Sequence, residues 1–202
     1  IRQLPQIEVA TECVEDQAMA IYEDKQAMVT IKGVEDNFDE LTHISEILYG
    51  DGQFELKAAD MFYGIPGIRL AEQLGTGFAY EEPLQIYAPR REGQLNMANP
   101  MDGLVADELY SPGVIFNVKQ ARYDKNYILT DIAFARRIFE QQGMVSALEL
   151  RLKPGSNFES VKSEIKEIVG DECYVRDRFE QQDDTFKIMK IEKLIAYIFL
   201  TF

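Results

Sequence analysis

The last nine residues of the chain, 194–202, contain no charged side chain. Nine residues of helix rise only ~14 Å, about half of the ~30 Å hydrocarbon layer of a membrane. Just upstream, Lys187, Lys190 and Lys193 recur at every third position, as expected where a helix passes from water to lipid headgroups. We therefore interpret 181–202 as a stalk helix and the start of a transmembrane helix. The alternative is a C-terminal helix packed on its own core.

Composition excludes several classes of protein. The chain has 35 acidic and 21 basic residues, a net charge of −14, which argues against binding nucleic-acid phosphates. A hydrophobic fraction of 46% with 12 Phe and 10 Tyr excludes a disordered chain. We expect a folded, acidic domain whose partners are basic or neutral.

Signals for catalysis or metal binding are weak. One histidine, His43, and two cysteines, Cys13 and Cys173, are too few for a zinc site, and a Cys–His nucleophile lacks a flanking signature. There is no GxxxxGK phosphate loop and no G-x-S-x-G, and the acidic clusters lack calcium-loop spacing. We predict a protein that is not an enzyme, with no cofactor and no metal. Whether the two cysteines form a disulfide stays open.

Hydrophobic periodicity predicts an α+β fold. Strands are expected at 6–10, 18–22, 27–32, 61–65, 84–87, 114–118 and 127–129, and helices at 41–48, 68–74 and 131–141. From Pro89 to Gly103 no period is visible, and a loop of this length is usually functional.

The C-terminal third has the clearest pattern. A strand at 147–152, a helix opened by a Ser156 and Glu159 capping box, and a strand at 173–176 form a strand, helix, strand unit. One continuous helix is then expected from Glu180 to Phe202.

The order of these pieces resembles a known family. A mixed body, then Arg178-Phe179-Glu180-Gln181-Gln182, then 186–193 (FKIMKIEK) running into an apolar helix, resembles the periplasmic domain of lipoprotein-releasing ABC transporter permeases. These are the LolC and LolE type within the MacB and FtsX group. Three shorter segments are also similar: GIRLAEQLG at 67–75, LQIYAP at 84–89 and YILT at 127–130. The family's domain usually opens with a further strand and helix, so we expect that unit to be missing here.

The resemblance implies an architecture of two lobes. A porter-like βαβ lobe would comprise 1–33 and 144–180, and a smaller inserted α/β lobe of the Sabre type would comprise 34–143. It also implies a location in the inner membrane, with this domain in the periplasm. The implied partners are a cytoplasmic ATPase, a second permease subunit, the membrane itself, and a lipoprotein cargo or its periplasmic carrier, with no nucleic acid.

The implied mechanism is the transfer of ATP-driven motion to the release of lipoproteins. In the LolC branch a loop at the position of 89–103 grips the carrier, which makes its arginine, glutamine and apolar side chains the predicted partner-binding residues: Arg90, Arg91, Gln94, Leu95, Met97 and Met101. Two alternatives stay open, an FtsX-like scaffold that activates a cell-wall hydrolase and a MacB-like efflux pump.

Overall fold

The structure is a computed structural model that describes residues 1–91, 103–177 and 180. By its internal contacts the chain divides into two units. The large unit comprises Arg2 and Ile7–Arg151, and the terminal unit comprises Ile1, Gln3–Gln6 and Leu152–Phe202. The lobes expected from the resemblance, 1–33 with 144–180 and 34–143, stay a prediction.

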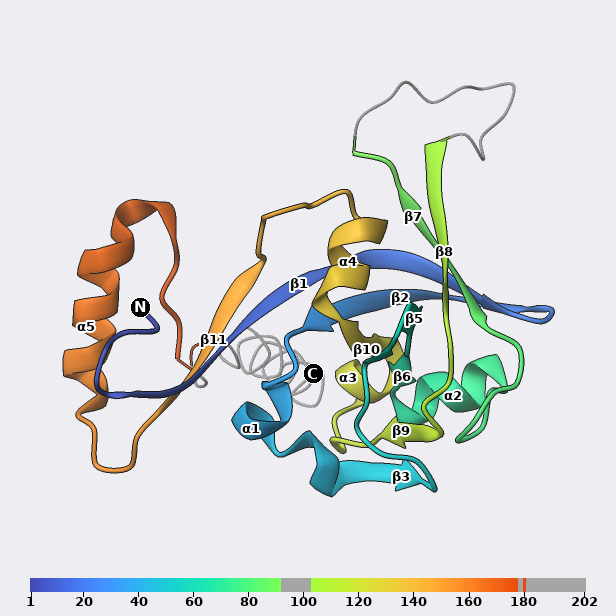
Figure 1. Cartoon of the computed structure of the whole chain (residues 1–202), viewed down its shortest axis with the longest axis horizontal. Helices are drawn as coiled ribbons and strands as arrows, with labels where there is room; N and C mark the ends of the chain where they lie inside the picture. Colours follow the sequence, from blue (N-terminus) through green and yellow to red (C-terminus); the bar gives the residue numbers. More distant parts are fainter. Residues whose placement is uncertain (92–102, 178–179, 181–202) are drawn as a thin grey trace, which may run out of the picture. The chain divides into compact units, whose positions relative to one another are not determined.

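A seven-stranded sheet forms the body of the large unit, with strand order β6-β10-β2-β1-β7-β8 and β11 paired with β1. The two long strands β1 and β2 run side by side through it (Figure 1). The strands are β1 (Ile7–Tyr22), β2 (Lys25–Val34), β6 (Ile65–Pro66), β7 (Leu84–Pro89), β8 (Leu104–Leu109), β10 (Tyr127–Asp131) and β11 (Ala147–Leu152). β10 is parallel to β2, whereas β1 with β2 and β7 with β8 are antiparallel. The predicted α+β class is confirmed.

Side-chain alternation gives this sheet two packed faces. Val14, Ile31 and Ile128 belong to one hydrophobic core, while Cys13 and Leu129, their neighbours in sequence, belong to another. Because successive strand residues point to opposite faces, the two cores lie on opposite sides of the sheet. The sheet is therefore buried on both sides over part of its length.

Short helices cover these faces. They are α1 (Phe38–Thr42), η1 (Ile44–Ile47), α2 (Ile68–Leu74), α3 (Ala121–Asn126) and α4 (Ile132–Ile138). Asp131 caps α4 by accepting a hydrogen bond from the Ala133 N–H. α4 approaches β2 closely: a Cβ added to Gly33 would lie 2.3 Å from the Ala135 Cβ. Only glycine allows this helix to pack so near the strand.

Two small pairings complete the large unit. β3 (Leu48–Gly50) pairs with β9 (Val114–Phe116), and β4 (Lys57–Ala58) pairs with β5 (Met61–Phe62). Val114 and Phe116 of β9 pack into the same core as Cys13 and Leu129. The β3–β9 pair therefore adds to α1 and η1 in covering the sheet face that carries Cys13 and Leu129.

The terminal unit contains α5 (Phe158–Val169) and η3 (Gly170–Glu172). The Asn157 side chain caps α5 by accepting from the Ser160 N–H, so the predicted capping box of Ser156 and Glu159 is wrong by one position. The predicted strand at 173–176 is also wrong, because this segment has no strand geometry. Its Tyr174 is 90% exposed, so the apolar residues have no surface to bury against.

Other predicted elements change in extent. The two strands expected at 6–10 and 18–22 are one strand, β1, and the strand expected at 61–65 is divided between β5 and β6. The helix expected at 41–48 is replaced by α1 and η1, and β8 and α3 were not predicted. Among the described residues, no helix has the length and apolar character needed to cross a membrane. The predicted stalk and transmembrane segment, 181–202, lies outside the described residues.

Candidate partner-binding site

The two predicted arginines lie at the loop end of the β7–β8 hairpin, where the loop begins. β7 and β8 pair antiparallel from Leu84 with Leu109 to Pro89 with Leu104, and the Arg90 N–H donates to the Gly103 carbonyl at 2.9 Å. The ladder therefore positions Arg90 and Arg91 directly before 92–102, the part of the loop that lies outside the described residues.

Both arginines contact the end of α4. Arg90 Nη1 lies 3.0 Å from Glu140 Oε1, and the Arg91 N–H donates to Glu140 Oε2 at 3.1 Å. The Arg91 Nε donates to the Phe139 carbonyl at 3.1 Å, where a cation also suits the negative end of the helix dipole. Both arginine side chains remain nearly half exposed. They therefore anchor the start of the loop, while both side chains stay partly exposed to solvent.

A hollow of about 690 Å³ lies beside this anchor. Its lining combines charged and apolar groups: Arg91, Arg137, Glu140, Gln142 and Met144. Met144 and Val145 expose nearly half of their side chains next to it. Arginine and methionine are enriched in the cores of protein interfaces, so this composition suits a protein partner.

The remaining predicted site residues lie outside the described residues. These are Gln94, Leu95, Met97 and Met101. The structure thus brings Arg90 and Arg91 together on Glu140 and leaves the role of the other four as a prediction. The sequence reasoning did not identify Glu140 or Asp16, whose carboxylate lies 3.5 Å from Arg91 Nη2. Nothing in the local pattern links them, because they are 49 and 75 residues from Arg91.

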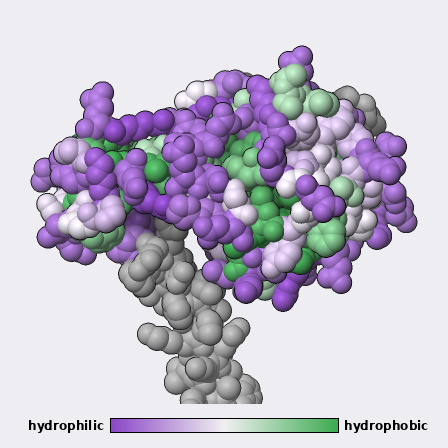
Figure 2. Space-filling model, turned by 60° about the horizontal axis from the view of Figure 1, so that its bottom comes forward, coloured by the Kyte–Doolittle hydropathy of each residue, from purple (hydrophilic) through white to green (hydrophobic). Residues whose placement is uncertain are grey.

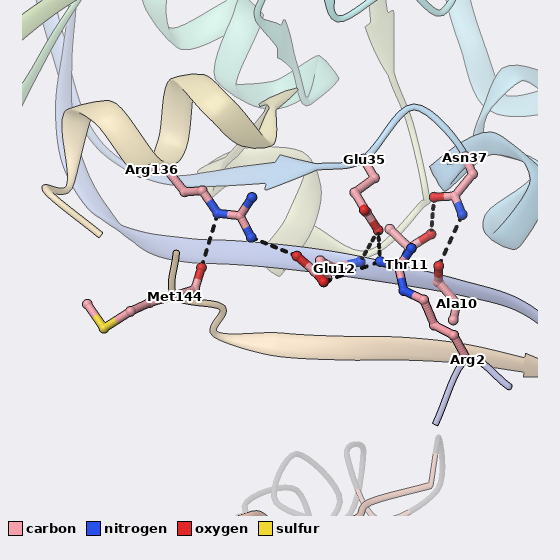
Figure 3. A network of polar contacts seen from close by, with 8 residues as sticks. All are labelled: Arg2, Ala10, Thr11, Glu12, Glu35, Asn37, Arg136 and Met144. Atoms are coloured by element: carbon pink, nitrogen blue, oxygen red, sulfur yellow. Dashed lines mark hydrogen bonds and ion pairs between the residues drawn. The ribbon is translucent and has the colours of Figure 1, made fainter. Parts of the chain in front are cut away.

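A polar network fixes the segment after α4 against β1 (Figure 3). Arg136 donates to the Met144 carbonyl at 3.2 Å and forms an ion pair with Glu12 at 2.7 Å. The Glu12 N–H in turn donates to Glu35, which is also paired with Arg2. The side of the hollow formed by Met144 is therefore held by charge-assisted bonds to β1.

A second, partly buried group of polar side chains lies next to Glu12, around Cys13 of β1. Lys32 Nζ is 2.5 Å from Glu149 Oε1, joining β2 to β11. Burial lowers the pKa of Lys32, but the interactions with Glu149, Cys13 and Glu15 together outweigh this effect and raise the pKa. Burial also raises the pKa of the neighbouring Cys13 thiol to about 12, with a further contribution from Glu149. A thiol held protonated in this way is a poor nucleophile.

Both cysteines are free in the structure, Cys13 buried and Cys173 exposed, so the disulfide considered from sequence is not formed. His43 has a left-handed backbone (φ 55°) and its Nε2 lies 2.9 Å from Arg151 Nη1. Over residues 1–91, 103–177 and 180, no three His, Cys, Asp or Glu side chains group as metal ligands.

The surface agrees with the acidic composition. On the face shown in Figure 2, hydrophilic side chains predominate and an apolar patch interrupts them on the large unit. An apolar patch within a hydrophilic surface is a candidate for contact with another molecule.

The fold is similar to extracytoplasmic domains of known transporters. The periplasmic region of MacB from Actinobacillus actinomycetemcomitans superposes with a TM-score of 0.56 at 7% identity, covering 83% of this chain and 68% of that one. The extracellular domain of the noncanonic ABC-type transporter YknZ from Gram-positive bacteria gives a TM-score of 0.54 at 11% identity, covering 84% and 78%. A domain of a putative permease from Porphyromonas gingivalis gives 0.51 at 18%, covering 84% and 74%.

At these identities the likeness establishes the fold alone. No protein-family model matches the chain, and no curated protein matches it in sequence.

Proposed function

We propose that this chain is the extracytoplasmic domain of an ABC transporter permease. The observation that supports this is the fold, which matches the periplasmic region of MacB, the extracellular domain of YknZ and a domain of a putative permease over 83% to 84% of the chain. In such a transporter a cytoplasmic ATPase hydrolyses ATP, and this domain is not catalytic. The permease would act in the inner membrane, with this domain in the periplasm and a second permease subunit beside it.

The more specific proposal is release of lipoproteins from the inner membrane. It rests on the order of sequence segments that resemble the LolC and LolE type, including the lysine and glutamate segment before 194–202. In this proposal the predicted helix from Glu180 transmits motion to the periplasmic lobes, which lift a lipoprotein and pass it to a soluble carrier. A continuous helix suits that role because its backbone hydrogen bonds are internal.

The proposed carrier contact is the loop that joins β7 to β8. Arg90 and Arg91 would contribute exposed guanidinium groups, and Gln94, Leu95, Met97 and Met101 would contribute amide and apolar contacts. The anchoring of both arginines on Glu140 supports this role, because a partner-binding loop with an ordered base loses less conformational entropy on binding.

The experiment is a lipoprotein-release assay with the full-length permease, its ATPase and the carrier in membrane vesicles. We expect ATP-dependent transfer to the carrier, reduced about 10-fold when Arg90 and Arg91 are both replaced by glutamine. The matched control is Arg69→Gln on α2, an exposed arginine on a different element. Transfer that is unchanged by the double variant would remove the arginines from the proposed contact, and no transfer at all would contradict the lipoprotein role.

A MacB-like efflux pump is a second candidate, favoured by the TM-score of 0.56 with the periplasmic region of MacB. An efflux pump of this type carries its ATPase on the same polypeptide. The full-length gene therefore distinguishes the two: an encoded ATPase domain would support the pump, and a permease encoded beside a separate ATPase would support lipoprotein release.

A further inference from the structure

The outer edge of β8 carries backbone groups that point away from the sheet. β8 is the last strand in the sheet order. The Arg90 N–H donates to the Gly103 carbonyl, which fixes the direction of the backbone N–H and C=O groups along β8. Those of residues 103, 105, 107 and 109 point toward β7, and those of residues 104, 106, 108 and 110 point outward. The Tyr110 N–H confirms this parity, because it donates outward to the Phe62 carbonyl at 2.9 Å.

Part of this edge is already paired within the chain. The Gly64 N–H donates to the Tyr110 carbonyl, so the segment 62–64 lies parallel to the end of β8. The Glu108 N–H is satisfied by the Asp107 side chain at 2.9 Å. The edge continues at Leu104 and Ala106, whose outward backbone groups have no hydrogen-bond partner within 1–91, 103–177 and 180, and Ala106 is exposed. An open edge of this kind is a template for one more strand.

An acidic hollow lies alongside the same edge. It has a volume of about 430 Å³ and is lined by Asp60, Phe62, Gln85, Ala106, Asp107, Glu108, Tyr110 and Arg137. Three carboxylates therefore face one guanidinium. Asp107 is paired with Arg137 at 2.6 Å, and Glu108 accepts from Gln85 and from the Tyr110 hydroxyl. Among the described residues, Asp60 has no hydrogen bond or ion pair, so its charge is available to a ligand.

We infer that β8 docks an extended segment of a partner protein that pairs with Leu104 and Ala106 and places a lysine or arginine in this hollow. The added strand would lie about 4.8 Å from β8, within the reach of a long basic side chain to Asp60. Charge complementarity selects this partner: a second copy of the chain would bring further carboxylates to the same place. The inference goes beyond the proposed function and does not depend on it.

The test uses the full 202-residue chain, labelled with ¹⁵N, and two synthetic peptides of alternating threonine with lysine or threonine with glutamate. We expect the lysine peptide to slow hydrogen exchange of the Ala106 amide about 10-fold at saturation, and the glutamate peptide to have no effect. Asp60→Asn should weaken binding of the lysine peptide about threefold, because it removes a single solvent-screened charge.

Ala106→Pro tests the backbone contact itself. Its N–H points outward and takes no part in the pairing with β7, so proline is tolerated there, as on other sheet edges. We expect this variant to bind the lysine peptide at least about 10-fold more weakly, whereas Ala106→Thr, which keeps the N–H, binds normally.

Three results would overturn the inference. They are an Ala106 amide whose exchange the lysine peptide leaves unchanged, equal binding of both peptides, and protection of Ala106 that rises with protein concentration without any peptide. The last would assign the edge to a second copy of the chain. The exchange measurement on the unsubstituted chain decides the matter even if Ala106→Pro does not fold.

Discussion

Lys32 and Glu149 form an ion pair that joins two strands separated by 117 residues in sequence. Their side chains are only 16% and 31% exposed, so each charge depends on the other for compensation. The pair holds β11 on the sheet together with the Ser146 N–H, which donates to the Cys13 carbonyl at 2.8 Å. The pair therefore ties β11 to β2 within the large unit.

Removing one member of the pair should therefore destabilise the large unit. We expect Glu149→Gln to lower the free energy of unfolding by about 2 kcal/mol, because Lys32 keeps a charge that is largely removed from water. Urea denaturation followed by circular dichroism measures this. The double variant Lys32→Met with Glu149→Leu should recover part of the loss, and equal stability of wild type and Glu149→Gln would contradict the assigned role.

The hairpin anchor offers a way to separate partner binding from folding. Glu140→Gln removes the charge that pairs with Arg90 and receives the Arg91 N–H. If the arginines serve a partner, this variant should bind the carrier somewhat more weakly than wild type, because the base of the loop is less ordered, but more tightly than Arg90→Gln, and it loses about 0.5 to 1 kcal/mol of stability. Calorimetric titration and thermal unfolding give the two quantities independently. Weaker binding than in Arg90→Gln would assign the arginines to anchoring alone.

The two thiols should differ in reactivity. Cys173 is exposed, whereas Cys13 is buried and its pKa is raised to about 12. At pH 8 we expect one thiol per chain to react rapidly with a disulfide reagent and the second to react only in denaturant. Cys173→Ser should abolish the rapid phase, and Cys13→Ser should leave it intact. Two rapid thiols in the folded wild type would contradict the burial of Cys13.

Stability should fall in alkaline solution. Unfolding allows the Cys13 thiol to ionise near its ordinary pKa of 9.0, whereas the folded protein holds the proton to about 12. Tyr127 behaves alike, because burial and its hydrogen bond to Glu15 raise its pKa from 10.0 to about 12. The free energy of unfolding should thus decrease between pH 9 and 12, by up to about 1.4 kcal/mol per pH unit for each group.

Denaturation at several pH values measures this slope, and the variants assign it. Cys13→Ala should give a shallower decrease above pH 9, and Tyr127→Phe a shallower decrease above pH 10. Only the slope is diagnostic, since either substitution also changes core packing. A flat profile in wild type would show that neither group is withheld from water.

A reciprocal pair of hydrogen bonds occurs before the predicted stalk helix. The Glu180 N–H donates to Asp177 Oδ1 at 2.8 Å, and the Asp177 N–H donates to Glu180 Oε2 at 2.9 Å, the geometry of a capping box. Lys162 of α5 lies 2.7 Å from the same Glu180 carboxylate. We expect Asp177→Ala to reduce helicity and to cost about 1 kcal/mol. Asp171→Ala is the control, and equal helicity in both variants would contradict the cap.

Local pattern was sufficient for elements whose boundaries are encoded by neighbouring residues. The helix at Ile68–Leu74 was predicted to the residue, because Gly67 precedes its apolar stripe and Gly75, with a left-handed φ of 79°, ends it. The strand at Ala147–Leu152 was predicted equally well from its alternation and the Pro154-Gly155 turn. In both cases the signal lies within a few residues of the element.

Elements that depend on distant partners were missed. β8 has Asp107 and Glu108 in its centre, which are poor strand formers, and it exists because β7 pairs with it along six residues. β1 was predicted as two strands because Glu12, Glu15 and Asp16 interrupt its apolar pattern. The structure compensates those charges with Arg136, Tyr127 and Arg91, which lie on other elements. Glu140 and Asp16, the partners of Arg90 and Arg91, could not be predicted either, because they are distant in sequence.

The close contact of Gly33 with Ala135 also positions the groups that follow α4. α4 ends close to the Phe139 carbonyl and Glu140, the two groups that receive the arginines of the hairpin. A methyl group at residue 33 would displace α4, and the Phe139 carbonyl and the Glu140 carboxylate would shift with it. The position of the groups that hold Arg90 and Arg91 thus depends on Gly33, a residue without a side chain that lies on another element, β2.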